Sequence, residues 1–337
     1  MSKQYTVAVA GATGAVGVEM LKCLEQRGFP VKHLKLLASK RSIGREMEFA
    51  GEKIKIEELT QDSFAGVDIA LFSAGASRSR EFAASAVAAG AVVIDNSSAF
   101  RLDDKVPLVV PEVNPEDVKW HNGIIANPNC TTVLMLVALK PLHDISPIQR
   151  IVVSTYQSAS GAGAQAMDEL VNQTRQYLEG EDLVISILPH RSAFNLFSHN
   201  SAIDEASGYC EEELKMVNET RKMLHDPRIR VSATAVRVPV LRAHAEALTF
   251  EQVRKVSVEE ARQALAKAPG VKLVDDPKAN YFPMPLDASD QDEVLVGRLR
   301  DDLSSDRGLS LFLCGDQLLK GAALNAVQIA ELLIRRG

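Results

Sequence analysis

Apolar runs alternate with segments of helical periodicity through the first 130 residues. Continuous apolar runs at Tyr5–Ala10, Val67–Ser73 and Ala91–Asp95 are typical of strands that are buried on both faces of a parallel sheet. Between these runs, apolar residues recur at helical spacing from Val16 to Leu24, and Arg80–Ala89 is an Ala-rich segment with the same period. This alternation predicts a doubly wound α/β sheet.

After about residue 130 the pattern changes to strands with fewer helices between them. Alternating positions at Ile148–Gln157, Ile229–Val240 and Ala243–Gln252 predict strands with one exposed face, and hence an α+β domain with a mixed or antiparallel sheet. A helix is predicted from Val133 up to Pro141, because proline disrupts a helix interior. A final Ala- and Leu-rich helix, Leu318–Arg335, is not assigned to either domain by its pattern alone.

Composition narrows the class of protein further. The chain has 337 residues, of which 46% are hydrophobic and 24% charged, and a net charge of −6, as expected for globular domains. Lysines and arginines are scattered, which argues against nucleic-acid binding. There is no apolar run of membrane-spanning length and no signal-peptide pattern, so we expect a cytoplasmic protein that does not bind membranes. The four cysteines form no CxxC motif and are expected to be free thiols, without a metal site.

A glycine-rich segment, Gly11-Ala-Thr-Gly14-Ala-Val-Gly17, lies between the first predicted strand and the first helix. Glycines there permit a tight turn and close approach of the backbone to a phosphate, which the helix N-terminus then attracts. The spacing is a variant of the dinucleotide-binding fingerprint, and its strand–turn–helix setting strengthens that interpretation. The alternative is a tight structural turn that binds no ligand.

Leu34–Ala38 is predicted to be the second strand along the chain, and the residues at its end indicate which dinucleotide would bind. An NAD site has an acidic residue there, whereas this chain has Leu37-Ala-Ser-Lys-Arg-Ser42. Ser39, Arg41 and Ser42 suit the 2′-phosphate of NADP, since a guanidinium forms charge-assisted bonds with phosphate. A solvated basic turn is the alternative.

Cys130 has the most informative surroundings of the four cysteines. It follows Asn127-Pro-Asn129 and immediately precedes an apolar helical segment, so we expect it at a helix N-terminus. The helix dipole favours the thiolate there, and a thiolate is the nucleophile needed to trap an acyl group.

In these features the chain resembles aspartate-β-semialdehyde dehydrogenase over nearly its whole length. The matching motifs are Gly11–Gly17, Asn96-Ser-Ser-Ala-Phe-Arg101, Val110-Pro-Glu-Val-Asn114, Asn127-Pro-Asn-Cys-Thr131, Tyr156-Gln-Ser-Ala-Ser-Gly161, Arg237-Val-Pro-Val240 with His244, Pro283-Met-Pro-Leu286, Val296-Gly-Arg298 and Lys320-Gly-Ala-Ala-Leu-Asn-Ala-Val-Gln328. The resemblance implies a Rossmann-type NADP-binding domain over residues 1–130 and 318–337. It also implies a catalytic and dimerisation domain over 131–317, and a homodimer.

The resemblance also assigns roles to particular residues. Cys130 matches the nucleophile, His244 the general acid/base and Gln157 a residue that orients the substrate. The implied substrate contacts are Arg237 for the α-carboxylate, Arg101 and Lys215 for phosphate, Glu212 for the amino group, Gln157 and Asn129. The implied cofactor contacts are Gly11, Thr13, Gly14, Ala15, Val16, Ser39, Arg41, Ser42, Ser160, Gly161 and Gln317, the last of which replaces an expected Asn.

The implied reaction is reversible: L-aspartate-4-semialdehyde, phosphate and NADP⁺ give 4-phospho-L-aspartate and NADPH through a cysteine thioester. The pathways would be the biosynthesis of lysine and diaminopimelate, methionine, threonine and isoleucine. Arginine suits a planar carboxylate, Arg with Lys suits phosphate, and Glu suits an ammonium group, so the residue types agree with these substrates.

Other interpretations remain open from the sequence. N-acetyl-γ-glutamyl-phosphate reductase uses the same chemistry, but its substrate has no free ammonium and would not need Glu212. A non-catalytic NADP-binding protein would not call for Cys130 together with His244. The purely structural alternatives are an exposed ion pair for Glu212 and Lys215, a polar strand residue for His244, a buried amide for Gln157, and pairing of Arg101 with Asp103 or Asp104.

Overall fold

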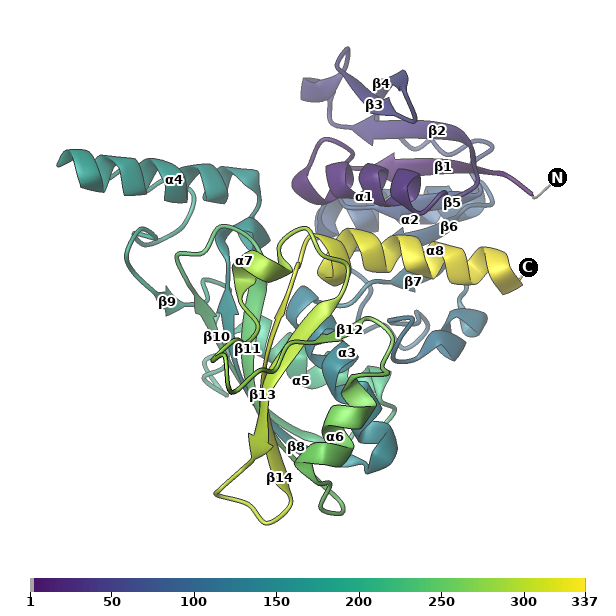
Figure 1. Cartoon of the computed structure of the whole chain (residues 1–337). Coiled ribbons are helices and arrows are strands. Elements are labelled where there is room, and N and C mark those ends of the chain that lie inside the picture. Colours follow the sequence, from purple (N-terminus) through teal and green to yellow (C-terminus); the bar gives the residue numbers. More distant parts are fainter. Residues whose placement is uncertain (1–2, 337) are drawn as a thin grey trace. The chain divides into compact units, whose positions relative to one another are not determined.

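The computed structural model describes residues 3–336 and divides into two compact units (Figure 1). The first unit comprises the described residues up to Asn129 together with those from Ala322 onwards, and the second runs from Cys130 to Gly321. These boundaries differ from those expected from the sequence by one residue near 130 and by four near 318.

The first unit is built on a seven-stranded sheet with the order β3-β4-β2-β1-β5-β6-β7. All neighbouring strands are parallel except the β3–β4 pair at one edge. This sheet confirms the predicted doubly wound α/β class. Its strands are β1 Tyr5–Ala10, β2 Val31–Ala38, β3 Glu46–Phe49, β4 Glu52–Glu58, β5 Ile69–Phe72, β6 Val92–Asp95 and β7 Ile124–Ala126.

Among the described residues, the α-helices of this unit are α1 Ala15–Gln26, α2 Ala76–Ala88 and α8 Leu324–Arg336. α1 and α8 run side by side (Figure 1), joined by a bidentate ion pair in which Arg27 donates to Glu331. The last helix is shorter than its sequence pattern predicts, because Leu319–Ala323 forms a π-helical turn before α8 begins. The β3–β4 hairpin and β7 were not predicted, since their residues lack a long apolar run.

The second unit contains a mixed seven-stranded sheet with the order β12-β13-β14-β11-β8-β10-β9. β8 is parallel to β10 and β12 to β13, whereas the other neighbours are antiparallel. This confirms the predicted mixed sheet. Its strands are β8 Ile148–Gln157, β9 Phe197–Ser198, β10 Arg230–Arg237, β11 His244–Gln252, β12 Val271–Leu273, β13 Val294–Asp301 and β14 Gly308–Gly315.

The helices of this unit are α3 Cys130–Ile145, α4 Ala164–Glu179, α5 Glu211–Met223, α6 Val258–Leu265 and α7 Pro285–Ala288. The prediction that the helix after Cys130 stops at Pro141 is wrong, because α3 continues to Ile145. An interior proline costs about 3 kcal/mol. Leu139 and Leu142 are nevertheless fully buried, and α3 packs against β8, β11, β13 and β14, so tertiary burial outweighs that cost.

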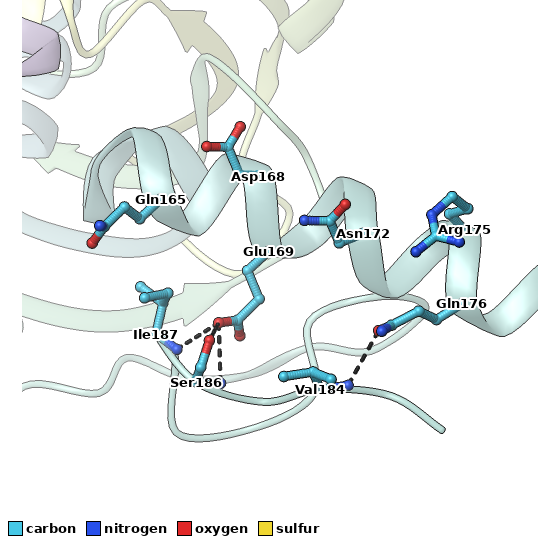
Figure 2. Close-up of a pocket in the computed structure, with 9 residues that line it drawn as sticks. All are labelled: Gln165, Asp168, Glu169, Asn172, Arg175, Gln176, Val184, Ser186 and Ile187. Carbon is cyan, nitrogen blue, oxygen red and sulfur yellow. Dashed lines mark hydrogen bonds between the residues drawn. The ribbon is translucent and has the colours of Figure 1, made fainter. Parts of the chain in front are cut away.

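A polar pocket lies between α4 and the segment that follows it (Figure 2). The carboxylate of Glu169 accepts hydrogen bonds from the backbone N–H groups of Ser186 (3.1 Å) and Ile187 (2.5 Å) and from the Ser186 hydroxyl (3.0 Å). Gln176 accepts another from the N–H of Val184. None of the lining residues is a predicted site residue, and these bonds fix the loop to α4. Within residues 3–336, no helix combines the length and apolarity needed to cross a bilayer.

Candidate active site

The glycine loop of the first unit is built around two positions where a side chain does not fit. Gly11 has a φ of +86°, and a Cβ there would lie 2.4 Å from the carbonyl oxygen of Ser73. A Cβ on Gly17 would lie 2.3 Å from the carbonyl oxygen of Gly11. Gly14 is the N-cap of α1, and no side chain caps that helix. The first turn of α1 therefore keeps N–H groups to offer to a phosphate, as a dinucleotide site requires.

The basic turn predicted to select NADP follows β2 as a single 3₁₀ turn, Lys40–Ser42. The hydroxyls of Thr13 and Ser42 are 3.4 Å apart, so this turn and the glycine loop lie together. Arg41 and Ser39 are exposed, whereas Ser42 is buried. The turn could thus present a guanidinium and hydroxyls to one ligand, and the residues fit a phosphorylated ribose.

Arg101 and Asn129 belong to the first unit, and both are buried. The Arg101 guanidinium donates to the backbone carbonyls of Asn127 (2.9 Å) and Asn96 (2.8 Å). These bonds fix its orientation within the segment that leads to Cys130.

The candidate catalytic side chains of the second unit gather at one edge of the mixed sheet. Gln157 is the last residue of β8 and Arg237 the last of β10, and the two are register partners in these parallel strands. His244 is the first residue of β11, which runs antiparallel to β8. The ends of β8 and β10 and the start of β11 therefore meet at the same edge.

Ser158 connects two of these groups. Its backbone N–H and its hydroxyl lie 3.1 and 3.0 Å from Nδ1 of His244, and its carbonyl accepts from Nη1 of Arg237 at 2.7 Å. The backbone N–H can only donate, which favours the tautomer with a proton on Nε2 of His244. The hydroxyl, 2.9 Å from that of Ser160, can support either tautomer.

Burial, reinforced by the charge of Arg237, lowers the pKa of His244 to about 3. The ring is therefore neutral over the physiological range. Burial also lowers the pKa of the Arg237 guanidinium, an effect that its interactions with Cys130 and Glu212 oppose. Gly161 allows close packing here, since a Cβ on it would lie 3.0 Å from Nε2 of His244 and 3.3 Å from Nη1 of Arg237.

Glu212 and Lys215 form an ion pair of 3.1 Å on the first turns of α5. The pair is not an exposed one, because the Glu212 side chain is only 8% exposed. Its other carboxylate oxygen accepts from Nε2 of Gln157 at 3.3 Å. The structure thus brings a carboxylate, an ammonium and an amide together.

Cys130 is the first residue of α3, as the sequence predicted. Gly321, in the π-helical turn before α8, packs against it: a Cβ on Gly321 would lie 2.8 Å from the Cβ of Cys130. Such π turns occur frequently at functional sites. The other three cysteines are buried, and none of the four is in a disulfide.

Gln317 is buried, and its amide is engaged within the second unit. Its Nε2 donates to the hydroxyl of Ser160, and its Oε1 accepts from the backbone N–H of Ala243 at 3.1 Å. These bonds connect the turn after β8 to the residue before His244. The predicted cofactor contact of Gln317 stays a prediction.

Sequence reasoning missed Ser158, His199 and Gly321. His199 contacts Arg237, with its Nε2 at 3.0 Å from Nη2. It lies in an irregular segment without periodicity, so no signal in the sequence indicated it. Gly321 belongs to the family motif at residues 320–328, but its close approach to residue 130 depends on the tertiary fold.

Comparison with known proteins identifies the family. Residues 6–121 match the family described as semialdehyde dehydrogenase, NAD binding domain, and residues 139–320 match semialdehyde dehydrogenase, dimerisation domain. A protein of Synechocystis sp. named aspartate-semialdehyde dehydrogenase is 60% identical over 100% of this chain and 99% of its own length. The chain belongs to the aspartate-semialdehyde dehydrogenase family. The aspartate-semialdehyde dehydrogenase of Bacillus subtilis is 48% identical over 99% of this chain and 98% of its own length.

Solved structures of the family have the same fold. The crystal structure of aspartate semialdehyde dehydrogenase II complexed with ASA, from Vibrio cholerae, superposes with a TM-score of 0.96 at 46% identity, covering 99% of both chains. A probable aspartate-semialdehyde dehydrogenase from Pseudomonas aeruginosa gives 0.93 at 30% identity, again with 99% of both chains covered. The two-domain architecture of the family is therefore that of this chain.

Proposed function

We propose that this chain is an aspartate-semialdehyde dehydrogenase that interconverts L-aspartate-4-semialdehyde and 4-phospho-L-aspartate. The observation that carries the proposal is the cluster of one cysteine, one neutral histidine and one arginine in the second unit. Cys130 begins α3 within electrostatic range of Arg237, and Ser158 joins Arg237 to His244. The names of relatives at 48–60% identity support the same activity.

In the oxidative direction the Cys130 thiolate attacks the aldehyde carbon and forms a thiohemiacetal. The start of α3 favours the thiolate, because the helix dipole is positive there. His244 exchanges a proton with the oxygen of the thiohemiacetal through Nε2, the nitrogen that Ser158 leaves available. Bound NADP⁺ would supply the hydride acceptor. Loss of the hydride from the thiohemiacetal carbon, and of the hydroxyl proton to His244, would leave a thioester on Cys130. Phosphate then attacks the thioester and frees the thiolate.

The polar side chains around this chemistry match the charges of the substrate. Arg237 binds the α-carboxylate, since a guanidinium suits a planar anion. Glu212 binds the α-ammonium group, and Gln157 orients the substrate beside Cys130. Lys215 supplies a cation for phosphate within the second unit, and Arg101 keeps its predicted role as a phosphate-binding cation of the first unit.

Arg41 and Ser42 make NADP the preferred nucleotide, and Thr13 to Val16 bind its pyrophosphate. The 2′-phosphate carries the charge that Arg41 would pair with, and NAD lacks it. Arg41→Ala is expected to weaken NADP binding several-fold while leaving NAD binding within twofold, because an exposed contact contributes only about 1 kcal/mol. Equal weakening of both nucleotides, measured by fluorescence titration, would remove Arg41 from the site.

The chain forms a homodimer through its second unit. Exposed apolar side chains concentrate on α4 and the segment after it, where a partner copy would cover them. They are Val171, Tyr177, Leu178, Val184, Ile185, Ile187, Phe194 and Leu196. The match to a dimerisation domain supports this assembly. We assign the enzyme to the cytoplasm, in the biosynthesis of lysine and diaminopimelate, methionine, threonine and isoleucine.

The decisive experiment follows NADPH formation with aspartate semialdehyde, with and without inorganic phosphate. We expect turnover only with phosphate, because phosphate releases the acyl group from Cys130. Cys130→Ala should retain NADPH binding and lose the reaction entirely. Phosphate-independent turnover would indicate simple oxidation to the acid, and full activity of Cys130→Ala would refute the mechanism.

A further inference from the structure

His199 lies beside the candidate carboxylate-binding arginine, although the two residues are 38 positions apart in the sequence. β9 pairs antiparallel with the end of β10, with Phe197 opposite Arg237. The backbone N–H of His199 continues this pairing by donating to the carbonyl of Ala235 at 2.9 Å. Strand pairing therefore fixes the imidazole next to the guanidinium, with Nε2 of His199 and Nη2 of Arg237 3.0 Å apart.

The contacts of His199 require a neutral ring. A guanidinium has only donors, so Nε2 must accept the bond from Arg237. Nδ1 then carries the proton, and the hydroxyl of Ser201, 3.1 Å away, can accept it. The backbone N–H of Ser201 also points at Nδ1 at 3.2 Å. With the proton on Nδ1, the hydroxyl of Ser201 is its hydrogen-bond acceptor, and the nearby N–H of Ser201 makes no bond to this nitrogen. A second ring proton would go on Nε2 and turn the contact with Arg237 into a donor–donor contact.

Charged groups face the ring from two elements: Glu212, Glu213 and Lys215 from α5, and Arg237 from β10. Burial is the main cause that lowers the pKa of His199, the charge of Glu212 opposes it, and that of Arg237 adds to it. The electrostatic surroundings therefore agree with the neutral ring that the hydrogen bonds require.

An uncharged hydrogen-bond acceptor can orient an arginine without competing with the anion that the arginine must bind. Both fixed partners of Arg237, the Ser158 carbonyl and the His199 ring, are uncharged. Its Nε is buried without a hydrogen-bond partner. A carboxylate in the place of His199 would pair with the guanidinium and compete with an incoming substrate carboxylate. An imidazole holds the guanidinium without placing a carboxylate in direct contact with it.

We propose that His199 is a positioning residue that holds Arg237 at the edge of the mixed sheet, ready for the substrate carboxylate. The inference rests on the proposed function, because it takes Arg237 as the group that binds that carboxylate. It adds that the arginine is oriented by a neutral acceptor supplied from the segment after β9.

Three variants test the proposal through a split in kinetic constants. His199→Ala should raise the KM for aspartate semialdehyde about tenfold, the effect of losing one hydrogen bond near 1.4 kcal/mol, with the KM values for phosphate and NADP within twofold. His199→Gln retains an acceptor and should recover most of the loss. His199→Glu supplies a competing anion and should raise the same KM beyond that of His199→Ala. Parallel changes in all three KM values, or a Gln variant as poor as the Ala variant, would overturn the proposal.

A second measurement does not depend on turnover. In protein with isotope-labelled histidine, NMR shifts of the ring nitrogens give the titration of His199, with His199→Gln providing the assignment. We expect the pKa of the His199 ring to lie below 6.5 in the wild type and to rise in Arg237→Leu. An unchanged titration in Arg237→Leu would overturn the proposal. An inactive wild-type protein would refute the proposed function. The NMR titration would then be the test of whether His199 holds Arg237 in place.

Discussion

The two sheets of this protein present functional groups in different ways. In the mainly parallel sheet of the first unit, the interior strand β5 is buried at every position, and the segment after β1 offers mainly backbone through Gly11, Gly14 and Gly17. In the mixed sheet of the second unit, buried positions of β8 are separated by positions that are partly or fully exposed. The side chains proposed to act in the reaction lie at its strand ends, namely Gln157, Arg237 and His244. Backbone N–H groups are suited to binding the phosphates that nucleotides have in common. Side chains are suited to a reaction in which covalent bonds form and break.

The comparison predicts that His244→Asn separates nucleotide binding from catalysis more strongly than any other variant considered below. The amide oxygen of Asn can accept from the Ser158 N–H, but no atom replaces Nε2. The kcat should fall by about 10² to 10⁴, the usual contribution of a positioned acid or base, while NADPH affinity stays unchanged. Steady-state kinetics and fluorescence titration measure the two effects. A kcat within tenfold of the wild type would contradict the role of Nε2.

A smaller effect is expected from Gly17→Ala in the first unit. The added Cβ would lie 2.3 Å from the carbonyl oxygen of Gly11 and 2.7 Å from that of Ala12, so the loop must shift. We expect a loss of about 1–3 kcal/mol in the free energy of unfolding and weaker NADPH binding, measured by urea unfolding and titration.

Gly14→Ala is the matched control for this loop. Its Cβ would meet its nearest neighbour atom at 3.4 Å, and its φ of −78° suits any residue. Its cost should stay below about 1 kcal/mol, that of a poorer N-cap. Equal losses in the two variants would show that close packing at Gly17 does not shape the loop.

Glu246 differs from these strand-end side chains, because its buried carboxyl group has no hydrogen-bond partner. It shares a face of β11 with His244, it is fully buried, and neither carboxyl oxygen has a hydrogen-bond partner. Burial raises its pKa well above 4.5. The folded protein therefore keeps the proton, while the unfolded chain loses it above about pH 4.5.

The Glu246 carboxyl makes its full contribution to the free energy of unfolding below about pH 4.5. That contribution decreases as the pH rises toward the pKa of Glu246 in the folded protein, by up to about 1.4 kcal/mol per pH unit. Glu246→Gln does not titrate. Its free energy of unfolding relative to the wild type should therefore increase between pH 5 and pH 7 in urea unfolding. A difference that is constant with pH would contradict the raised pKa.

The local features of both units were predictable from sequence, because they depend on short segments. β1, the glycine turn and α1 follow from one apolar run, the glycines that end it and the helical spacing after them. The position of Cys130 at the start of α3 follows from the preceding Asn-Pro-Asn. The passage of α3 through Pro141 was not predictable, since it depends on burial against strands far along the chain. The Arg237–His199 bond has the same origin, because only the pairing of β9 with β10 brings the two together.

The contact between Gly321 and Cys130 joins the last and the first residue of the second unit. A segment of almost two hundred residues thus starts and finishes at neighbouring points. Domains whose termini meet can be inserted into a host chain without forcing the host apart. Cys130, the proposed nucleophile, is the first residue of this segment, and the other proposed catalytic residues, Gln157 and His244, lie within it. A single insertable segment therefore carries all three.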